Sequence, residues 1–230
     1  MTAQLLVSEI FGPTFQGEGP TAGRRAGFVR LARCNLDCAW CDTAYTWDWK
    51  RYDRAGEVSW VSAGEVLRRL DEMGVERIVI TGGEPLLQQA ALEPLLRLIA
   101  ARRWATEVET NGTVVPSAVT AGLVDRFNVS PKLASSEVGA QRRLNPVALQ
   151  ALCGTGKAVF KFVATNAADL DEIAGLVEEF HLTPVWVMPE GTTTDALLRD
   201  MRALAGSVLD RGWNLTSRLQ ILLWGDERAR

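Results

Sequence analysis

Short apolar runs alternate along the chain with segments in which apolar residues recur every three or four positions. Short runs rich in β-branched residues predict strands, and recurrence at helical spacing predicts helices with one buried face. The strands predicted in this way are Leu5–Phe11, Gly27–Ala32, Arg77–Thr81, Glu107–Glu109, Arg126–Val129, Val159–Val163, Pro184–Val187 and Leu219–Leu223.

Four amphipathic helices are predicted between these strands. The first begins at a capping box, in which Ser62 precedes Glu65 by three residues and both can bond the free backbone N–H groups of the first turn. We interpret the apolar stripes as core positions, and the segments 114–124 and 140–146 remain ambiguous. The stripes are Val66, Leu67, Leu70 and Met73; Leu92, Leu95, Leu96 and Ile99; Leu170, Ile173, Leu176, Val177 and Phe180; and Leu197, Met201, Leu204 and Val208.

The alternation of strands and helices predicts an α/β fold. Parallel strands joined by right-handed crossovers form either a doubly wound sheet or a (β/α) barrel, and the pattern alone does not choose between them. No internal repeat, low-complexity tract or linker divides the chain. We therefore expect one domain over residues 1–230.

A polar or glycine-rich motif follows each of six predicted strands. Singly, such pairs as Gly-Gly, Asn-Gly or Ser-Pro are ordinary turn signals. In a parallel sheet, however, all carboxyl ends lie along one rim, so the six loops are expected to converge on one cleft. The motifs are the cysteine-rich segment after Ala32, Thr81–Pro85, Thr110–Gly112, Ser130–Lys132, Ala164–Asn166 and Met188–Gly191.

Composition narrows the class of protein. The 230 residues are 47% apolar and 23% charged, enough to bury one core without disulfides or an obligatory partner. A net charge of −3 argues against a general nucleic-acid-binding surface. No apolar stretch reaches the roughly 18 residues of a membrane span, and Met1–Gln4 lacks the basic flank of a signal peptide. We expect a cytoplasmic protein with neither a nucleic-acid nor a membrane partner.

Three of the four cysteines fall within eight residues, as Cys34, Cys38 and Cys41. A C-x3-C-x2-C loop can place three thiolates around one face of an iron-sulfur cluster and leave one iron open. Structural zinc would need a fourth ligand, for which Cys153 and His181 are the distant candidates. Accidental clustering of buried thiols is a further alternative, whereas a disulfide framework fits poorly, because such frameworks belong to small cysteine-dense secreted domains.

These motifs resemble those of the radical S-adenosylmethionine (radical SAM) superfamily: the three-cysteine loop, with Trp40 between its last two cysteines, and Gly82-Gly83-Glu84-Pro85 after the next strand. Within it, Phe15-Gln16-Gly17-Glu18-Gly19 and Cys41-Asp42-Thr43 resemble the 7-carboxy-7-deazaguanine synthase family. The resemblance runs over nearly the whole chain, to Arg218–Gly225. It implies a partial (β/α) TIM-like barrel of the radical SAM type.

The resemblance implies a 4Fe-4S cluster held by Cys34, Cys38 and Cys41, and S-adenosylmethionine bound at its open iron. Thiolates are suitable ligands for such a cluster. Glycines would allow close backbone approach and Glu84 would offer an anionic acceptor. The residues implied to contact S-adenosylmethionine are Trp40, Asp42, Gly82, Gly83, Glu84, Ser130, Pro131, Lys132, Met188, Pro189, Glu190 and Gly191.

The resemblance also implies a pterin site and a Mg²⁺ site. Arg30 would pair with the substrate carboxylate, a geometry that a guanidinium matches well, although a water-facing strand arginine is the alternative. Thr43 would bind Mg²⁺ through its hydroxyl, although it could equally be a helix N-cap. The residues implied to bind substrate are Phe15, Gln16, Gly17, Glu18, Arg30 and Thr81.

The implied activity is that of a radical SAM carbon-nitrogen lyase in queuosine and 7-deazapurine biosynthesis. Flavodoxin or ferredoxin would donate one electron, and 6-carboxy-5,6,7,8-tetrahydropterin would be contracted by radical rearrangement to 7-carboxy-7-deazaguanine with loss of ammonia. The cofactor carries the difficult chemistry. We expect a homodimer.

Two alternatives remain. A glycyl-radical activating enzyme shares the cysteine spacing and the Gly-Gly-Glu-Pro turn, but it acts on a protein and does not need the Gln-Gly-Glu-Gly motif. A metal-binding module without catalysis would not require the Ser-Pro-Lys and Met-Pro-Glu loops on the same rim.

Overall fold

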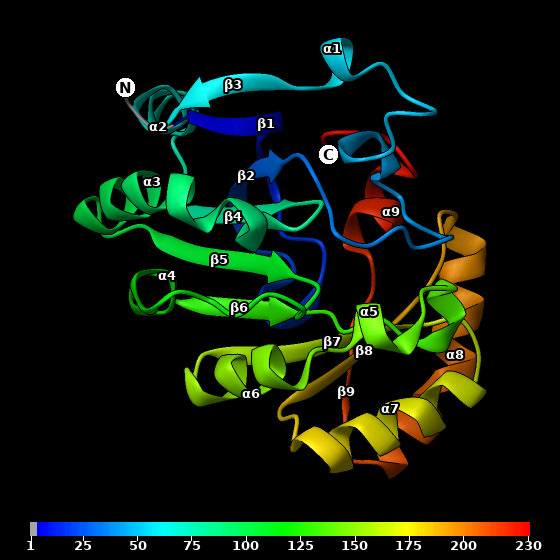
Figure 1. Ribbon diagram of the computed structural model, residues 1–230. Helices are drawn as coiled ribbons and strands as arrows, with labels where there is room; N and C mark the ends of the chain where they lie inside the picture. Colours follow the sequence, from blue (N-terminus) through cyan, green and yellow to red (C-terminus); the bar gives the residue numbers. More distant parts are fainter. Residues whose placement is uncertain (1–3) are drawn as a thin grey trace.

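Figure 1 shows the computed structural model, which describes residues 4–230 as a single nine-stranded sheet with helices packed against it. The strands stand in the order β3-β1-β2-β4-β5-β6-β7-β8-β9. Their bounds are β1 (Gln4–Phe15), β2 (Arg25–Leu31), β3 (Ser59–Ser62), β4 (Arg77–Gly82), β5 (Ala105–Thr110), β6 (Arg126–Val129), β7 (Ala158–Ala164), β8 (Val185–Pro189) and β9 (Asn214–Leu215).

The sheet is parallel from β2 through β4 to β9, and only β1 runs against its neighbours β2 and β3. A short connection explains the direction of β1, because Gln16 and Gly23 bond across the loop that joins it to β2. The two edge strands, β3 and β9, are not paired with each other. The fold is therefore an open, partial barrel, as the resemblance implied.

Helices fill the crossovers between the strands, and Figure 1 shows α2, α3 and α4 stacked along one part of the sheet and α7 and α8 along another. The α-helices are α1 (Arg54–Glu57), α2 (Ala63–Glu72), α3 (Gln89–Ala101), α4 (Ala118–Leu123), α5 (Ala140–Arg143), α6 (Pro146–Gly154), α7 (Ala168–Phe180), α8 (Thr194–Asp210) and α9 (Leu219–Trp224). The 3-10 helices are η1 (Gly19–Thr21), η2 (Ala44–Thr46), η3 (Pro85–Gln88) and η4 (Ala134–Ser136).

Side chains alternate between the two faces of the parallel strands, and the two faces differ in chemistry. The face toward the helices is apolar and forms the main core, to which the strands contribute Val29, Ile80, Val108, Phe127 and Phe160. The residues one position further along the same strands line an internal cavity: Arg30, Thr81, Glu109, Asn128 and Lys161. The helices thus stabilise the fold from outside, while the inner wall is left for polar chemistry.

One predicted strand is wrong. Residues 219–223 form helix α9, because a short continuous apolar run does not distinguish a strand from a buried helix. The last strand is instead the two-residue β9, and β3 was not predicted. The ambiguous segments also become helical: 114–124 contains α4, and 140–146 contains α5 and the start of α6.

The prediction that Met1–Gln4 does not begin a signal peptide concerns residues 1–3, which lie outside the described residues. Within residues 4–230, no helix combines the length and the hydropathy that crossing a membrane requires.

Replacing Ser62 by Ala should lower the free energy of unfolding by about 1 kcal/mol. The Ser62 hydroxyl accepts a hydrogen bond from the Glu65 N–H at 3.2 Å and so caps α2. Ser59→Ala, in the same exposed strand β3, is the matched control. Equal midpoints for the two variants in urea denaturation would contradict the role of the cap.

Candidate active site

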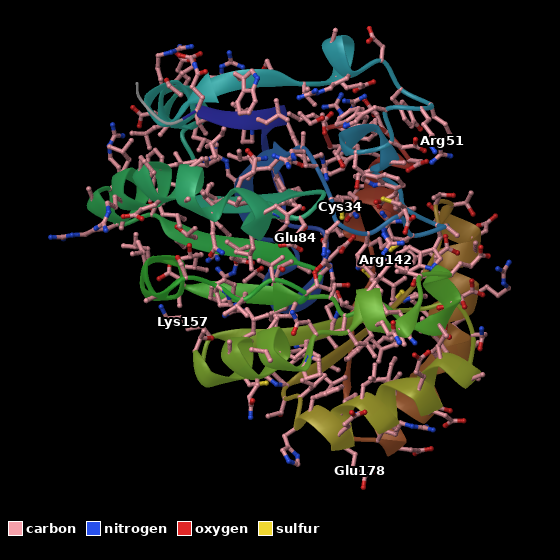
Figure 2. The ribbon with its side chains drawn as sticks, in the orientation of Figure 1. Cys34, Arg51, Glu84, Arg142, Lys157 and Glu178 are labelled. Atoms are coloured by element: carbon pink, nitrogen blue, oxygen red, sulfur yellow. The ribbon has the colours of Figure 1, made fainter. Side chains whose placement is uncertain are left out.

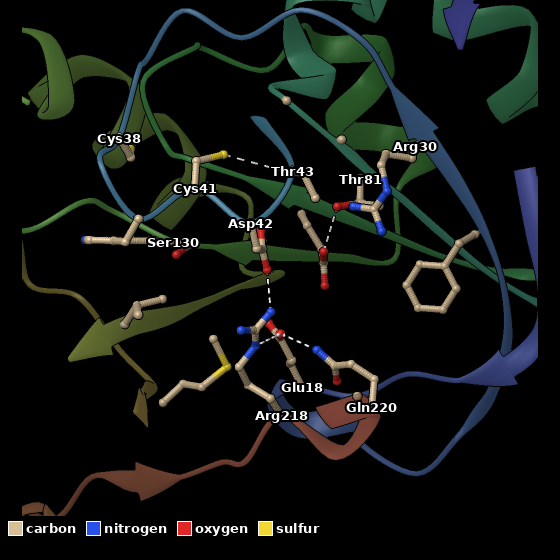
Figure 3. Close-up of a pocket in the computed structure, with 18 of the residues that line it drawn as sticks. Glu18, Arg30, Cys38, Cys41, Asp42, Thr43, Thr81, Ser130, Arg218 and Gln220 are labelled. Atoms are coloured by element: carbon tan, nitrogen blue, oxygen red, sulfur yellow. Dashed lines mark hydrogen bonds and ion pairs between the residues drawn. The ribbon is translucent and has the colours of Figure 1, made fainter. Parts of the chain in front are cut away.

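A cavity of about 640 Å³ opens where the predicted site loops leave the strands (Figure 3). It is lined by residues from the first loop, the cysteine loop, the inner face of the strands and the C-terminal segment. The structure brings nearly all predicted site residues to this cavity. Those that do not line it are Glu84, Pro131, Pro189 and Gly191.

Cys34, Cys38 and Cys41 are unpaired thiols on one loop, and each lines the cavity. The Leu36 N–H donates to the Cys34 sulfur at 3.4 Å, and the Trp47 indole N–H donates to the Cys41 sulfur at 3.4 Å. Burial raises the pKa of the Cys34 thiol to about 12 and also raises that of Cys38. The Cys34 and Cys38 thiols are therefore protonated, and a bound metal would have to displace their protons.

The thiol loop fits an iron-sulfur cluster. Among residues 4–230, no three His, Cys, Asp or Glu side chains surround a point where one metal ion could sit. A 4Fe-4S cluster needs no such convergence, because each thiolate binds a different iron. The N–H donors directed at two of the sulfurs suit a cluster as well, since hydrogen bonds to the sulfurs stabilise its negative charge.

Gly82, the last residue of β4, and Gly83 are required by the close approach of their backbone to the start of the cysteine loop. A Cβ at Gly82 would lie 1.9 Å from the Leu31 carbonyl oxygen, and one at Gly83 would lie 2.2 Å from that of Arg33. Gly82 also has a φ of 138°, which favours glycine. The Gly-Gly turn therefore packs directly beneath the cysteine loop and holds its first residues in place.

Glu84 lies beneath the cavity rather than in it; Figure 2 shows it in the interior near Cys34. Its carboxylate accepts the Leu86 N–H at 3.0 Å, the Asn111 N–H at 2.7 Å and the Thr110 hydroxyl at 2.9 Å. Burial raises its pKa in spite of these donors. In this structure, Glu84 ties the loop after β4 to the loop after β5.

Glu18 forms a buried charge cluster with Lys161 and Arg218. The exposed fractions of the three side chains are 14%, 7% and 10%. The amide of Gln220 also donates to Glu18 at 2.9 Å. Burial would raise the pKa of Glu18, but the two cations lower it to about 2. Glu18 is therefore ionised and fixed in the wall of the cavity.

A second carboxylate, Glu109, organises the neighbouring part of the wall. Its two oxygens accept the Thr81 hydroxyl at 2.8 Å and the Gln16 amide at 3.2 Å. Glu109, on β5, thus connects Gln16 and Thr81, both of which were predicted to bind substrate. The wall presents amide, hydroxyl and carboxylate groups to one ligand.

Arg30 lines the cavity from β2, and its side chain is 16% exposed, so it is not the fully water-facing strand arginine of the alternative. Its Nε donates to Glu9 at 2.7 Å, and its guanidinium lies 5.4 Å from the ring centroid of Phe11. Glu9 also accepts the Tyr45 hydroxyl at 2.9 Å. Within residues 4–230, the terminal Nη groups of Arg30 have no hydrogen-bond partner, so they can bind an anion in the cavity.

Thr43 lines the cavity with its hydroxyl 3.7 Å from the Cys41 sulfur. Although it precedes η2, its side chain makes no capping hydrogen bond, so the N-cap alternative is not supported. Asp42 pairs with Arg218. The Lys132 ammonium, which also lines the cavity, donates to the Ser130 hydroxyl at 2.9 Å and lies 5.5 Å from the Trp40 ring centroid.

Comparison with known proteins decides the family. The profile of the radical SAM superfamily matches residues 29–161. The 7-carboxy-7-deazaguanine synthase of Pyrobaculum aerophilum is 34% identical over 232 residues, which cover 100% of this chain and 99% of that protein. The chain belongs to the 7-carboxy-7-deazaguanine synthase family of radical SAM enzymes. It is accordingly a radical SAM lyase that uses a 4Fe-4S cluster and S-adenosylmethionine.

Two further relatives agree with this family. The 7-carboxy-7-deazaguanine synthase of Bacillus subtilis is 31% identical over 248 residues, which cover all of both chains. The crystal structure of QueE from Escherichia coli superposes with a TM-score of 0.72 and 26% identity, and the match covers 94% of each chain. The partial barrel described above is therefore the fold of this radical SAM family.

Several residues in the wall of this radical SAM site were not predicted from the sequence. Lys161 and Asn128 are polar residues inside apolar strands, and that interruption of the pattern is a signal that could have identified them. Gln220 lies in the segment 219–223 that was mistaken for a strand, and Arg218 immediately precedes it. The tail Asp226–Arg230 also lines the cavity, and its sequence carries no comparable signal.

Replacing Glu18 by Gln should lower the free energy of unfolding by about 3 kcal/mol near pH 7, because it leaves buried cations without their partner. The depressed pKa gives the sign: the contribution of Glu18 is complete above pH 4.5 and is lost as the pH falls toward 2. The difference between wild type and variant should therefore shrink in acid.

Glu65→Gln is the matched control, because Glu65 also binds two arginines, Arg68 and Arg69, but on the exposed face of α2. Its change should be much smaller. Urea denaturation at several pH values measures both variants, and an equally small loss at Glu18 would show that burial does not strengthen the cluster.

Proposed function

We propose that the chain contracts the ring of 6-carboxy-5,6,7,8-tetrahydropterin to 7-carboxy-7-deazaguanine and releases ammonia. One observation carries the proposal: the cavity combines three thiols with an inward arginine and a buried, ionised carboxylate. A pterin carboxylate needs a cation, and the amino-pyrimidinone edge needs acceptors and donors. Both kinds of group are present in one wall.

The carboxylate of the substrate would bind the Nη groups of Arg30, which face the cavity. Guanidinium–carboxylate pairs are short, charge-assisted and directional, so this contact would fix the orientation of the ring. Glu18 and Gln16 would bind the pyrimidinone edge, because the depressed pKa of Glu18 keeps it an acceptor. Thr81 would accept a further hydrogen bond, since its hydroxyl hydrogen is donated to Glu109 and its oxygen still has a free lone pair. Phe15 and Gly17 complete this part of the wall.

A second group of residues in the same cavity suits S-adenosylmethionine. Ser130 and Lys132 offer a hydroxyl and a cation to ribose and carboxylate groups, and Trp40, Asp42, Gly82, Gly83, Met188 and Glu190 line the same region. When bound, the reduced cluster and S-adenosylmethionine together supply a 5′-deoxyadenosyl radical that abstracts hydrogen from the substrate. The enclosing walls would keep water and other hydrogen donors away from the reacting atoms.

Glu84, Pro131, Pro189 and Gly191 would act on this site through their neighbours rather than by direct contact. Glu84 holds the loops after β4 and β5 together. The Gly191 carbonyl accepts from Arg218 at 2.9 Å and so helps to fix the arginine that binds Glu18. All four would thus belong to the binding site as residues that support the cavity wall.

Thr43 would supply the protein oxygen ligand for Mg²⁺, and the substrate carboxylate and water would complete its shell. Mg²⁺ prefers oxygen ligands and keeps several that are not protein groups. For the electron donor we propose flavodoxin or ferredoxin, for the assembly a homodimer, and for the compartment the cytoplasm, where thiols remain reduced. The whole chain, residues 1–230, would act as one domain.

The decisive experiment is anaerobic turnover of the reconstituted, reduced protein with 6-carboxytetrahydropterin, S-adenosylmethionine and Mg²⁺, followed by mass spectrometry. Formation of 7-carboxy-7-deazaguanine is expected. Cys38→Ala should abolish it and the cluster absorbance, whereas Cys153→Ala should retain both, since Cys153 lies on α6 outside the cavity.

Cleavage of S-adenosylmethionine without change of the pterin would indicate another substrate, such as the protein target of a glycyl-radical activating enzyme. A reconstituted cluster that cleaves no S-adenosylmethionine would favour a metal-binding module.

Thr43→Val should raise the Mg²⁺ concentration required for half-maximal turnover about tenfold, because it removes the proposed protein oxygen ligand. Thr43→Ser keeps the hydroxyl and should restore the wild-type Mg²⁺ dependence. The measurement is turnover as a function of Mg²⁺ concentration. If valine and serine variants respond to Mg²⁺ alike, Thr43 is not the ligand.

A further inference from the structure

The C-terminal tail returns to the site after α9. In Figure 1 the end of the chain (red) lies beside the segment that contains η2, close to α1. The tail is anchored there by Arg228, whose Nε donates to Glu9 at 2.5 Å and whose Nη2 donates to Glu57 at 2.7 Å. The guanidinium also lies 3.7 Å from the ring centroid of Tyr45. Three elements, β1, α1 and η2, thus bind one side chain.

Glu9 connects this anchor to the proposed substrate site. Its Oε2 accepts from Arg30 and Tyr45, and its Oε1 accepts from Arg228. Arginine and carboxylate prefer two parallel hydrogen bonds, yet Arg30 and Glu9 make only one. The second oxygen, Oε1, instead accepts from Arg228, and this bond holds the carboxylate in an orientation that leaves Arg30 a single hydrogen bond.

We propose that Arg228 is a positioning residue that keeps the guanidinium of Arg30 open to the substrate carboxylate. Without Arg228, Oε1 of Glu9 would turn to a terminal Nη group of Arg30 and form the two-bonded pair. The arginine would then have fewer donors left for an anion, and more positive charge would be neutralised. The tail, which is part of the cavity wall, thereby orients Glu9 and prepares the anion site. This inference rests on the proposed role of Arg30.

The test compares two inert ligands on the reconstituted holoenzyme with S-adenosylmethionine and Mg²⁺: 6-carboxypterin, and pterin without the carboxylate. Arg228→Ala should raise the Kd of 6-carboxypterin about tenfold, the equivalent of about 1.4 kcal/mol. The Kd of unsubstituted pterin should stay unchanged. In turnover, KM for the carboxylated substrate should rise while kcat changes little. A general loss of structure would weaken both ligands.

Arg102→Ala is a closely matched control. Arg102 also bonds a carboxylate, that of Asp71 at 2.7 Å, and lies 5.3 Å from the ring centroid of Trp104. Its side chain is 43% exposed, against 46% for Arg228, but it lies at the end of α3 outside the cavity. Glu57→Gln should give a smaller rise in the Kd of 6-carboxypterin, because it weakens one of the two carboxylate contacts of Arg228 but leaves the contact with Glu9 intact.

The outcomes separate the two proposals. If the wild type does not favour the carboxylated pterin, the role of Arg30 fails, and the role of Arg228 fails with it. If the wild type favours it and Arg228→Ala does so equally, only the role of Arg228 is overturned. Equal weakening of both ligands in Arg228→Ala would also overturn it.

Discussion

The alternation of side chains along the parallel strands is the constraint on which the site depends. One face packs against helices and is mainly apolar, so the buried charged residues of these strands, such as Lys161, project inward. Inside, a charge without a partner would be costly. The inner wall is consequently a set of mutual pairs, such as Lys161 with Glu18 and Thr81 with Glu109.

These pairs connect parts of the chain that are distant in sequence. Glu18 binds Arg218, 200 positions away, and Glu9 binds Arg228, 219 positions away. Both ends of the chain therefore belong to the same wall, and the ligand site is complete only when the fold is complete. A buried charge cluster adds little net stability compared with apolar residues of similar volume, although removing one of its partners is costly.

The cysteine loop is organised in a different way. The three thiols of the loop are free. The Gly82-Gly83 turn supports the start of the loop, because it contacts the backbone of Leu31 and Arg33 so closely that a side chain at either glycine would not fit. Asn111 adds an amide hydrogen bond to Asn35 at 3.0 Å. The ends of neighbouring strands thus hold the loop in place. A cluster bound to the three closely spaced cysteines would therefore have a defined position relative to the residues that line the cavity.

Local pattern was sufficient for the class of fold and most strands, and it indicated the three-cysteine loop as a candidate ligand set, because period-two alternation and cysteine spacing are encoded by neighbouring residues. The family motifs added Arg30, Glu18 and Thr43. Sequence could not reveal that residues 219–223 are helical, that Glu84 lies beneath the cavity, or that Arg228 reaches Glu9. Such features arise from contacts between distant segments, and only the packed tertiary structure brings those segments together.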